Sequence, residues 1–177
     1  MGRIAGIAAI SVVALAARAQ APAGPAAEVQ RAYNGVKGNI LKAADRMPSD
    51  SYNFKPTPDI RTFARVVEHV IEAQQRSCGA ANGSSANSSA ATLPPVPPET
   101  ADKATIVSAL QASFATCDQA FASLTEANFT DSLAVGPAGK RSRIGLLWGT
   151  VSHDNEQYAT LALYLRLKGL VPPSSEK

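Results

Sequence analysis

Residues 143–173 read RIGLLWGTVSHDNEQYATLALYLRLKGLVPP, and this stretch decides the fold. Six of its residues fall at steps of three or four and therefore share one helical face: Leu146, Thr150, His153, Gln157, Leu161 and Tyr164. Gly169 can adopt the left-handed cap conformation and the following prolines cannot continue a helix, so we expect the helix to end near Leu167. His153 and Gln157 lie one turn apart on the face that should be buried, where polar groups cost free energy unless they find partners. They either bind something together, or satisfy each other and a neighbouring helix.

The N-terminus has the pattern of a signal peptide. A short basic start is followed by an apolar run over residues 4–17, and residues 17–19 (Ala-Arg-Ala) have the small-x-small pattern that a signal peptidase cleaves. The run is shorter than the roughly 20 residues that span a membrane. We expect residues 1–19 to be a signal peptide and residues 20–177 to form one exported domain, periplasmic or secreted. An uncleaved N-terminal anchor is the alternative.

Charge argues against a nucleic-acid partner. The whole chain has 17 Lys and Arg and 14 Asp and Glu, and the segment 1–19 holds two of the basic residues and no acid, which leaves a mature charge of about +1. No basic run with interleaved aromatic residues occurs. After cleavage of the signal peptide we expect no membrane partner either. The sequence leaves open whether the protein is a monomer or a homodimer.

Three further amphipathic segments precede the C-terminal helix, and no strand pattern is evident. Thr57-Pro58-Asp59 has the chemistry of a helix start, and Thr100 is the expected cap of the third helix. The expected helices span residues 25–47, 57–76, 101–124 and 146–167. The sequence therefore predicts an all-α four-helix bundle.

The second and third helices are separated by a long connector, residues 78–98, that is rich in Gly, Ser, Asn and Pro. Antiparallel neighbours usually need only about 2–8 connecting residues, so this length allows the third helix to run parallel to the second. Cys78 and Cys117 would then lie toward the same end of the bundle. An exported protein meets oxidising conditions, and a disulfide between them is one interpretation. The other is that Cys117 fills a core position as a small apolar residue.

The inventory of reactive residues excludes several functions, because the sequence contains no nucleophile elbow, glycine-rich phosphate loop or Cys-x-x-Cys pair. It does resemble a known family. Thr57-Pro58, Phe63-Ala64 and His69, with the C-terminal His153-x-x-Glu156-Gln157-Tyr158 and the segment 164–173, look like the DinB/YfiT-like metalloprotein superfamily. The resemblance covers essentially all of residues 20–177. It implies an up-down-down-up four-helix bundle and, in members with assigned activities, a thiol-dependent transferase or isomerase with a divalent metal on three histidines.

The resemblance also implies which residues form the site. His69 matches the family's ligand on the second helix and His153 matches the first histidine on the fourth, whereas the family's second histidine there falls at Gln157. Zinc and nickel accept imidazole nitrogen readily, and a glutamine offers only a carbonyl oxygen. Glu156 lies about 100° around the helix and is not expected to replace Gln157.

Three interpretations stay open at this point. In the first, His69, His153 and Gln157 hold a divalent metal, zinc or nickel, and support a metal-dependent transferase or hydrolase reaction. In the second, tight metal binding is lost and the chain binds a small-molecule ligand or is weakly active. In the third, the polar face is only structural and the pocket is filled.

Overall fold

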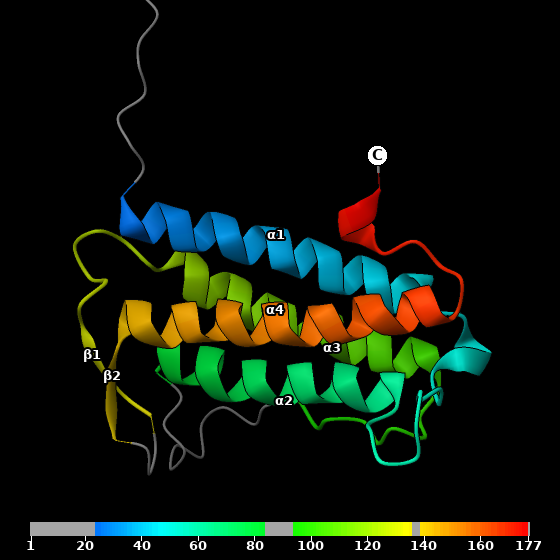
Figure 1. Cartoon of the computed structure of the whole chain (residues 1–177). Coiled ribbons are helices and arrows are strands. Elements are labelled where there is room, and N and C mark those ends of the chain that lie inside the picture. The colour runs from blue at the N-terminus through cyan, green and yellow to red at the C-terminus, as the bar shows by residue number, and fades with distance from the viewer. Residues whose placement is uncertain (1–23, 84–93, 136–138, 177) are drawn as a thin grey trace, which may run out of the picture.

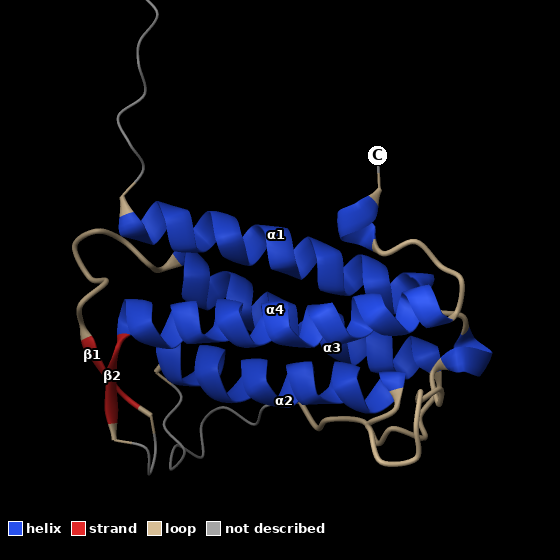
Figure 2. Cartoon of the chain, viewed as in Figure 1, coloured by secondary structure: helices blue, strands red, loops and turns tan. Residues whose placement is uncertain are grey.

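The computed structural model describes residues 24–83, 94–135 and 139–176. It is built from four long helices that pack side by side, with a small two-stranded ribbon at one end (Figures 1 and 2). The helices are α1 (Pro25–Arg46), α2 (Phe63–Ala81), α3 (Lys103–Ala122) and α4 (Arg143–Leu167). The strands are β1 (Ser132–Ala134) and β2 (Lys140–Ser142), and short 3₁₀ turns occupy Ser49–Ser51 and Pro173–Ser175. The all-α four-helix prediction is confirmed.

Contacts at both ends of α2 and α3 fix their relative direction. Thr62 Oγ1, just before α2, lies 2.8 Å from a carboxylate oxygen of Glu99, shortly before α3. Near the other ends of the two helices, a disulfide joins Cys78 to Cys117. The two helices therefore run parallel, and the long connector between them brings the chain back along the bundle.

The first and last helices, α1 and α4, run in the opposite direction to α2 and α3. Lys103, at the start of α3, donates to the carbonyl of Met47, just after α1, over 2.9 Å. The hydroxyl of Tyr164, near the end of α4, donates to the carbonyl of Arg61, just before α2, over 2.8 Å. Both α1 and α4 are thus antiparallel to the α2–α3 pair, which confirms the expected up-down-down-up arrangement.

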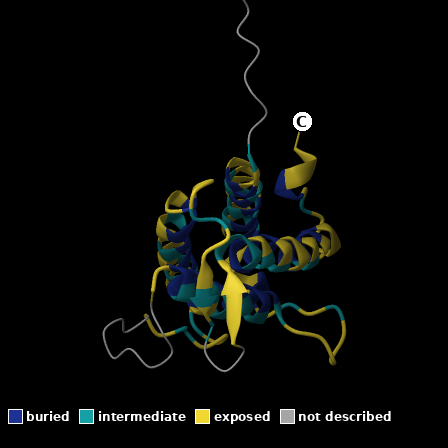
Figure 3. Ribbon diagram, turned by 90° about the vertical axis from the view of Figure 1, so that its left-hand side faces the viewer, coloured by how far each residue is buried: buried dark blue, intermediate teal, exposed yellow. Residues whose placement is uncertain are grey.

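The core lies between the four helices. Viewed along the bundle, buried positions face inward and exposed positions line the outside (Figure 3). Each helix contributes large side chains that are fully buried, among them Ile40, Phe63, Phe114 and Leu161. Burying an aliphatic or aromatic side chain of this size stabilises the fold by about 1.5–3 kcal/mol. This packing holds α2 and α4 against each other, which positions the histidines.

Two predicted helix starts are wrong. The second helix begins at Phe63, and its cap is Thr62, whose hydroxyl accepts a hydrogen bond from the Arg65 amide at 3.0 Å. The segment 57–59 forms a turn before it. The third helix is capped by Asp102, not Thr100, through a 2.8 Å bond from the Thr105 amide. In both cases a second capping residue stands a few positions downstream of the predicted one, and burial of the first apolar turn selects it.

The ribbon is also a correction, because no strand was expected. Strands β1 and β2 pair antiparallel, with Leu133 opposite Arg141, and lead directly into α4, where Ser142 caps the first turn. Three residues per strand are too few to produce a readable alternation. The end of α4 agrees with the sequence: Gly169 has φ +75°, the left-handed conformation that ends the helix.

The expected signal peptide, residues 1–19, lies outside the described residues. Within the described residues, no helix combines the length and apolar character that crossing a bilayer requires.

Candidate functional site

Two histidines face each other between α2 and α4. His69 on α2 and His153 on α4 have their Nε2 atoms 3.1 Å apart, with ring planes inclined at 65°. The side chains are 23% and 26% exposed, so both imidazoles border the surface without being open to it. At this distance one Nε2–H donates to the bare Nε2 of the other ring. The structure thus brings together the two histidines that the sequence placed on different helices, and we refer to them as the imidazole pair.

Behind His69 stands a carboxylate held by an arginine. Glu72 Oε2 lies 3.5 Å from His69 Nδ1, and Arg65 binds both oxygens of Glu72 at 3.0 and 3.2 Å. The Arg65 guanidinium lowers the pKa of Glu72, so this carboxylate stays charged. Burial, followed by the positive charge of Arg61, lowers the pKa of His69 and favours its neutral form. In the neutral form, Nδ1–H faces Glu72, and Nε2 accepts from His153.

Behind His153 stands a buried polar chain. Asp154 is fully buried, and its Oδ1 lies 3.6 Å from His153 Nδ1, which is longer than a normal hydrogen bond. Its other oxygen accepts from the Gln74 amide at 2.9 Å, and Gln74 in turn accepts from the Ser113 hydroxyl at 2.7 Å. Burial raises the pKa of Asp154. His153 Nδ1 and Asp154 Oδ1 are both buried, and neither has a hydrogen-bond partner among the described residues.

Gln157 lies one turn after His153, and the residue is 7% exposed. Among the described residues, no hydrogen bond joins its amide to either imidazole. Instead it lines an open groove of about 400 Å³ between α4 and the segment that leads into α2. The residues lining this Gln157 groove are Asp59, Ile60, Arg61, Val66, Glu156, Gln157, Thr160, Leu163 and Tyr164.

The imidazole pair suits a metal only in part. Two nitrogens 3.1 Å apart can both bind one zinc ion at about 2.0–2.1 Å, with an angle near 100° at the metal. However, no group of three or more His, Cys, Asp or Glu side chains in the part of the chain that the structure describes could hold a metal ion. Zinc sites of known types have at least three such protein ligands. The residues present therefore do not make a complete, tight metal site.

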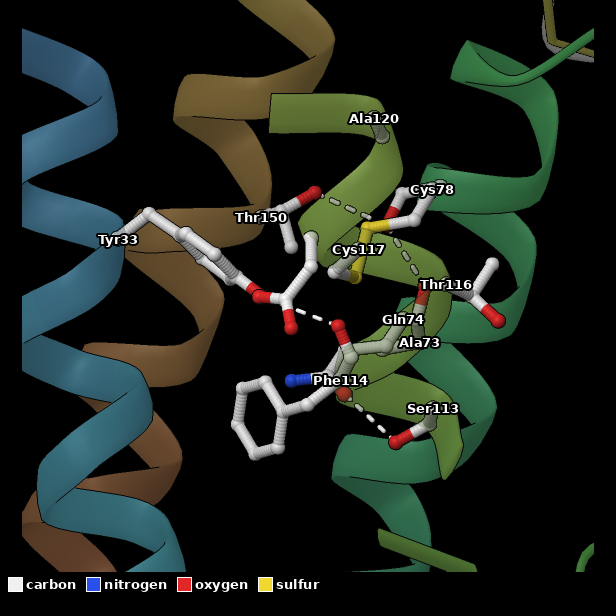
Figure 4. Close-up of a disulfide and its surroundings, with 12 residues drawn as sticks. Tyr33, Ala73, Gln74, Cys78, Ser113, Phe114, Thr116, Cys117, Ala120 and Thr150 are labelled. Atoms are coloured by element: carbon white, nitrogen blue, oxygen red, sulfur yellow. Dashed lines mark hydrogen bonds between the residues drawn. A yellow bond between two sulfur atoms is a disulfide. The ribbon is translucent and has the colours of Figure 1, made fainter. Parts of the chain in front are cut away.

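The two cysteines stabilise the bundle next to this site. The disulfide between Cys78 and Cys117 ties α2 to α3, and both residues are fully buried (Figure 4). Gln74 and Ser113 lie one turn before them on the same two helices, where Figure 4 shows the bond between their side chains. The crosslink thus holds together the two helices whose side chains support Asp154.

The protein is therefore an up-down-down-up helical bundle in which a histidine from the second helix faces one from the fourth. The chain belongs to the DinB superfamily, whose family model matches residues 32–161. Solved structures similar to it include a DinB-like protein from Bacillus cereus, with 18% identity, a TM-score of 0.64, and coverage of 82% of this chain and 93% of that one. Another is a DinB-like protein from Bacillus subtilis, with 15% identity, a TM-score of 0.61, and coverage of 80% and 92%. A search of curated proteins finds no match.

Sequence reasoning missed the residues behind the histidines. Asp154 stood beside His153 in the quoted stretch, and a buried acid next to a site histidine was a signal that could have been used. Gln74 and Ser113 gave no such signal, because nothing local distinguishes them from surface residues on an amphipathic helix. Glu72 follows His69 by three residues, the spacing at which helical side chains meet, and could have been found in that way.

Proposed function

We propose that this chain is an exported DinB-family domain with a degenerate His/His/Gln version of the three-histidine metal site, and that it binds a small molecule without holding a metal tightly. The observation that carries the proposal is the direct 3.1 Å contact between the two Nε2 atoms, with no third histidine to join them. Each imidazole already has the other as its partner, so binding a metal would first have to displace the hydrogen that they share. A carboxamide oxygen from Gln157 would bind zinc or nickel more weakly than an imidazole nitrogen would.

The Gln157 groove supports the binding part of the proposal. Its volume of about 400 Å³ lies within the roughly 300–1,000 Å³ of small-molecule sites. Gln157 and Thr160 offer neutral polar groups there, and Leu163 offers apolar surface. Such a mixture can orient a small ligand at Gln157, one helical turn from His153.

A divalent-metal-dependent transferase or hydrolase of the thiol-transferase type is the second candidate. The spacing of the imidazole pair favours it, because His69 and His153 are close enough that both could hold one zinc or nickel ion. His69, His153 and Gln157 would then hold the metal, and the metal would supply the chemistry.

Metal analysis of untagged protein separates the two candidates. We expect purified wild type to contain well under one equivalent of zinc or nickel, and Gln157→His to take up one equivalent of zinc, because it restores the third imidazole one turn from His153. Glu156→His is the matched control: it adds a histidine at the neighbouring position, off the site face, and should gain none. One equivalent of metal in wild type that disappears in His69→Ala would overturn the proposal and establish the metal-dependent alternative.

Export is supported by the disulfide, since such bonds persist in oxidising compartments and are rare in the cytosol. Expression of the full chain followed by intact-mass measurement of the exported protein tests this. We expect a mass that begins at Gln20. Exported material that still carries Met1 would contradict cleavage, and protein found only in the cytosol would contradict export.

A further inference from the structure

The Gln157 groove has charged residues on both of its walls. Asp59 and Arg61 come from the segment before α2, and Glu156 comes from α4. All three are exposed, and none forms an ion pair within 4.0 Å among the described residues, although the exposed Lys42 and Glu176 do. Charges of both signs thus line the groove without an ion-pair partner in the described part of the chain.

The wall that carries Arg61 is anchored. The Tyr164 hydroxyl donates to the Arg61 carbonyl at 2.8 Å, and this bond ties the segment before α2 to the end of α4. Tyr164 itself is buried. The positions of the Arg61 and Glu156 backbones relative to each other are therefore set by the fold.

Apolar surface lies between these charges. Ile60 is 41% exposed and Leu163 is 51% exposed, two of the five large hydrophobic side chains that stand out as exposed in the described part of the chain. Both line the groove, together with Val66. A ligand that covers them gains about 25 cal/mol for each Å² of apolar surface removed from water.

Building on the proposed function, we propose that the Gln157 groove binds a small zwitterion of the amino-acid class, with its carboxylate on Arg61, its ammonium group on Glu156 and Asp59, and its apolar side chain on Ile60 and Leu163. Two acids and one base give the groove a net charge of −1, which disfavours a simple anion. Conversely, the single guanidinium is well suited to a carboxylate, which it can bind through two parallel hydrogen bonds.

Binding of three matched probes to the full mature protein tests the charge requirement. L-phenylalanine carries both charges, N-acetyl-L-phenylalanine lacks the ammonium group, and L-phenylalaninamide lacks the carboxylate. Amide chemical shifts followed by NMR during titration give the dissociation constants and locate the site. We expect L-phenylalanine to bind about tenfold more tightly than either analogue, as is typical of one charge-assisted hydrogen bond, with shifts at Arg61 and Glu156.

Two variants assign the charges. Arg61→Gln should make L-phenylalanine and its amide bind equally, and Glu156→Gln should reduce the preference over the N-acetyl analogue. Both side chains are exposed, so neither change should unfold the protein. Arg31→Gln, which alters an exposed arginine on α1 that does not line the groove, is the control and should leave all three constants unchanged.

The outcomes separate this inference from the proposed function. Equal binding of the three probes, or tightest binding of an analogue, overturns the zwitterion and leaves a small-molecule groove. Binding of L-phenylalanine whose shifts lie away from Arg61 and Glu156 overturns the location. If no probe binds, the zwitterion proposal is overturned. The metal content of the purified protein still shows independently whether the imidazole pair holds a metal.

Discussion

Reducing the Cys78–Cys117 disulfide should remove a large part of the stability of this domain. The bond closes a loop of 39 residues between α2 and α3. In the chain-entropy model, a closed loop of this length lowers the entropy of the unfolded chain enough to stabilise the fold by about 4 kcal/mol. Small domains have a total stability of about 5–15 kcal/mol, so the reduced protein should be close to its unfolding threshold at 37 °C.

Urea unfolding followed by circular dichroism, with and without a thiol reductant, measures this difference. We expect the midpoint to fall on reduction and the denaturant slope to rise, because the reduced unfolded chain exposes more surface. The double variant Cys78→Ala/Cys117→Ala is the control: its unfolding curve should not respond to reductant. A loss below about 1 kcal/mol in the wild type, or two titratable thiols in the unreduced, unfolded protein, would refute the reasoning.

Three other changes have defined outcomes. Burial raises the pKa of Glu68 from 4.5 to about 7, so the unfolded chain loses this proton at a lower pH than the folded protein does. The free energy of unfolding should therefore fall by up to about 3 kcal/mol as the pH rises from 4.5 to 7. Glu68→Gln should abolish that fall when urea unfolding is compared at pH 4.5 and 8. Tyr33→Phe should cost about 1–2 kcal/mol in the same assay, because the buried Tyr33 hydroxyl donates to Asp118 at 2.8 Å, and an unchanged midpoint would mean that water replaces the bond. Gly169→Ala should lower the free energy of unfolding by about 1 kcal/mol through its positive φ alone, since a methyl group there would touch nothing within 4 Å, and a rise in stability would contradict this.

The fold could be predicted from the sequence because its strongest signals are periodic and long. Four helical patterns were enough to give the bundle. The long connector allowed a parallel α2–α3 pair, and the family resemblance implied it. The exact helix starts could not be predicted in this way, because Thr57 and Thr62 are both good caps. The choice between them depends on the burial of Phe63, which is a tertiary effect. The ribbon at β1 and β2 was missed for a similar reason, since strands of three residues carry no readable pattern.

The site could be predicted only where its residues are spaced along one helix or matched a family pattern. His153 and Gln157 were assigned to one face by spacing alone, and His69 was added by resemblance. Gln74 on α2 donates a hydrogen bond to Asp154 on α4, and no spacing rule within one helix predicts a contact between two helices.

The carboxylates behind the two histidines bear on whether the site binds a metal. Asp154 and Glu72 face the two Nδ1 atoms, and a carboxylate behind an imidazole is the arrangement that orients histidine ligands in metal sites. Under the proposed function, the chain keeps the outer part of a metal centre, and Gln157 takes the position of the third ligand. If that glutamine alone prevents tight binding, a single substitution to histidine should restore it without any further change, because the orientation of the other two ligands is already in place. If Gln157→His remains metal-free, the outer carboxylates serve to hold the imidazole pair together, and the site has been remodelled around the hydrogen bond between His69 and His153.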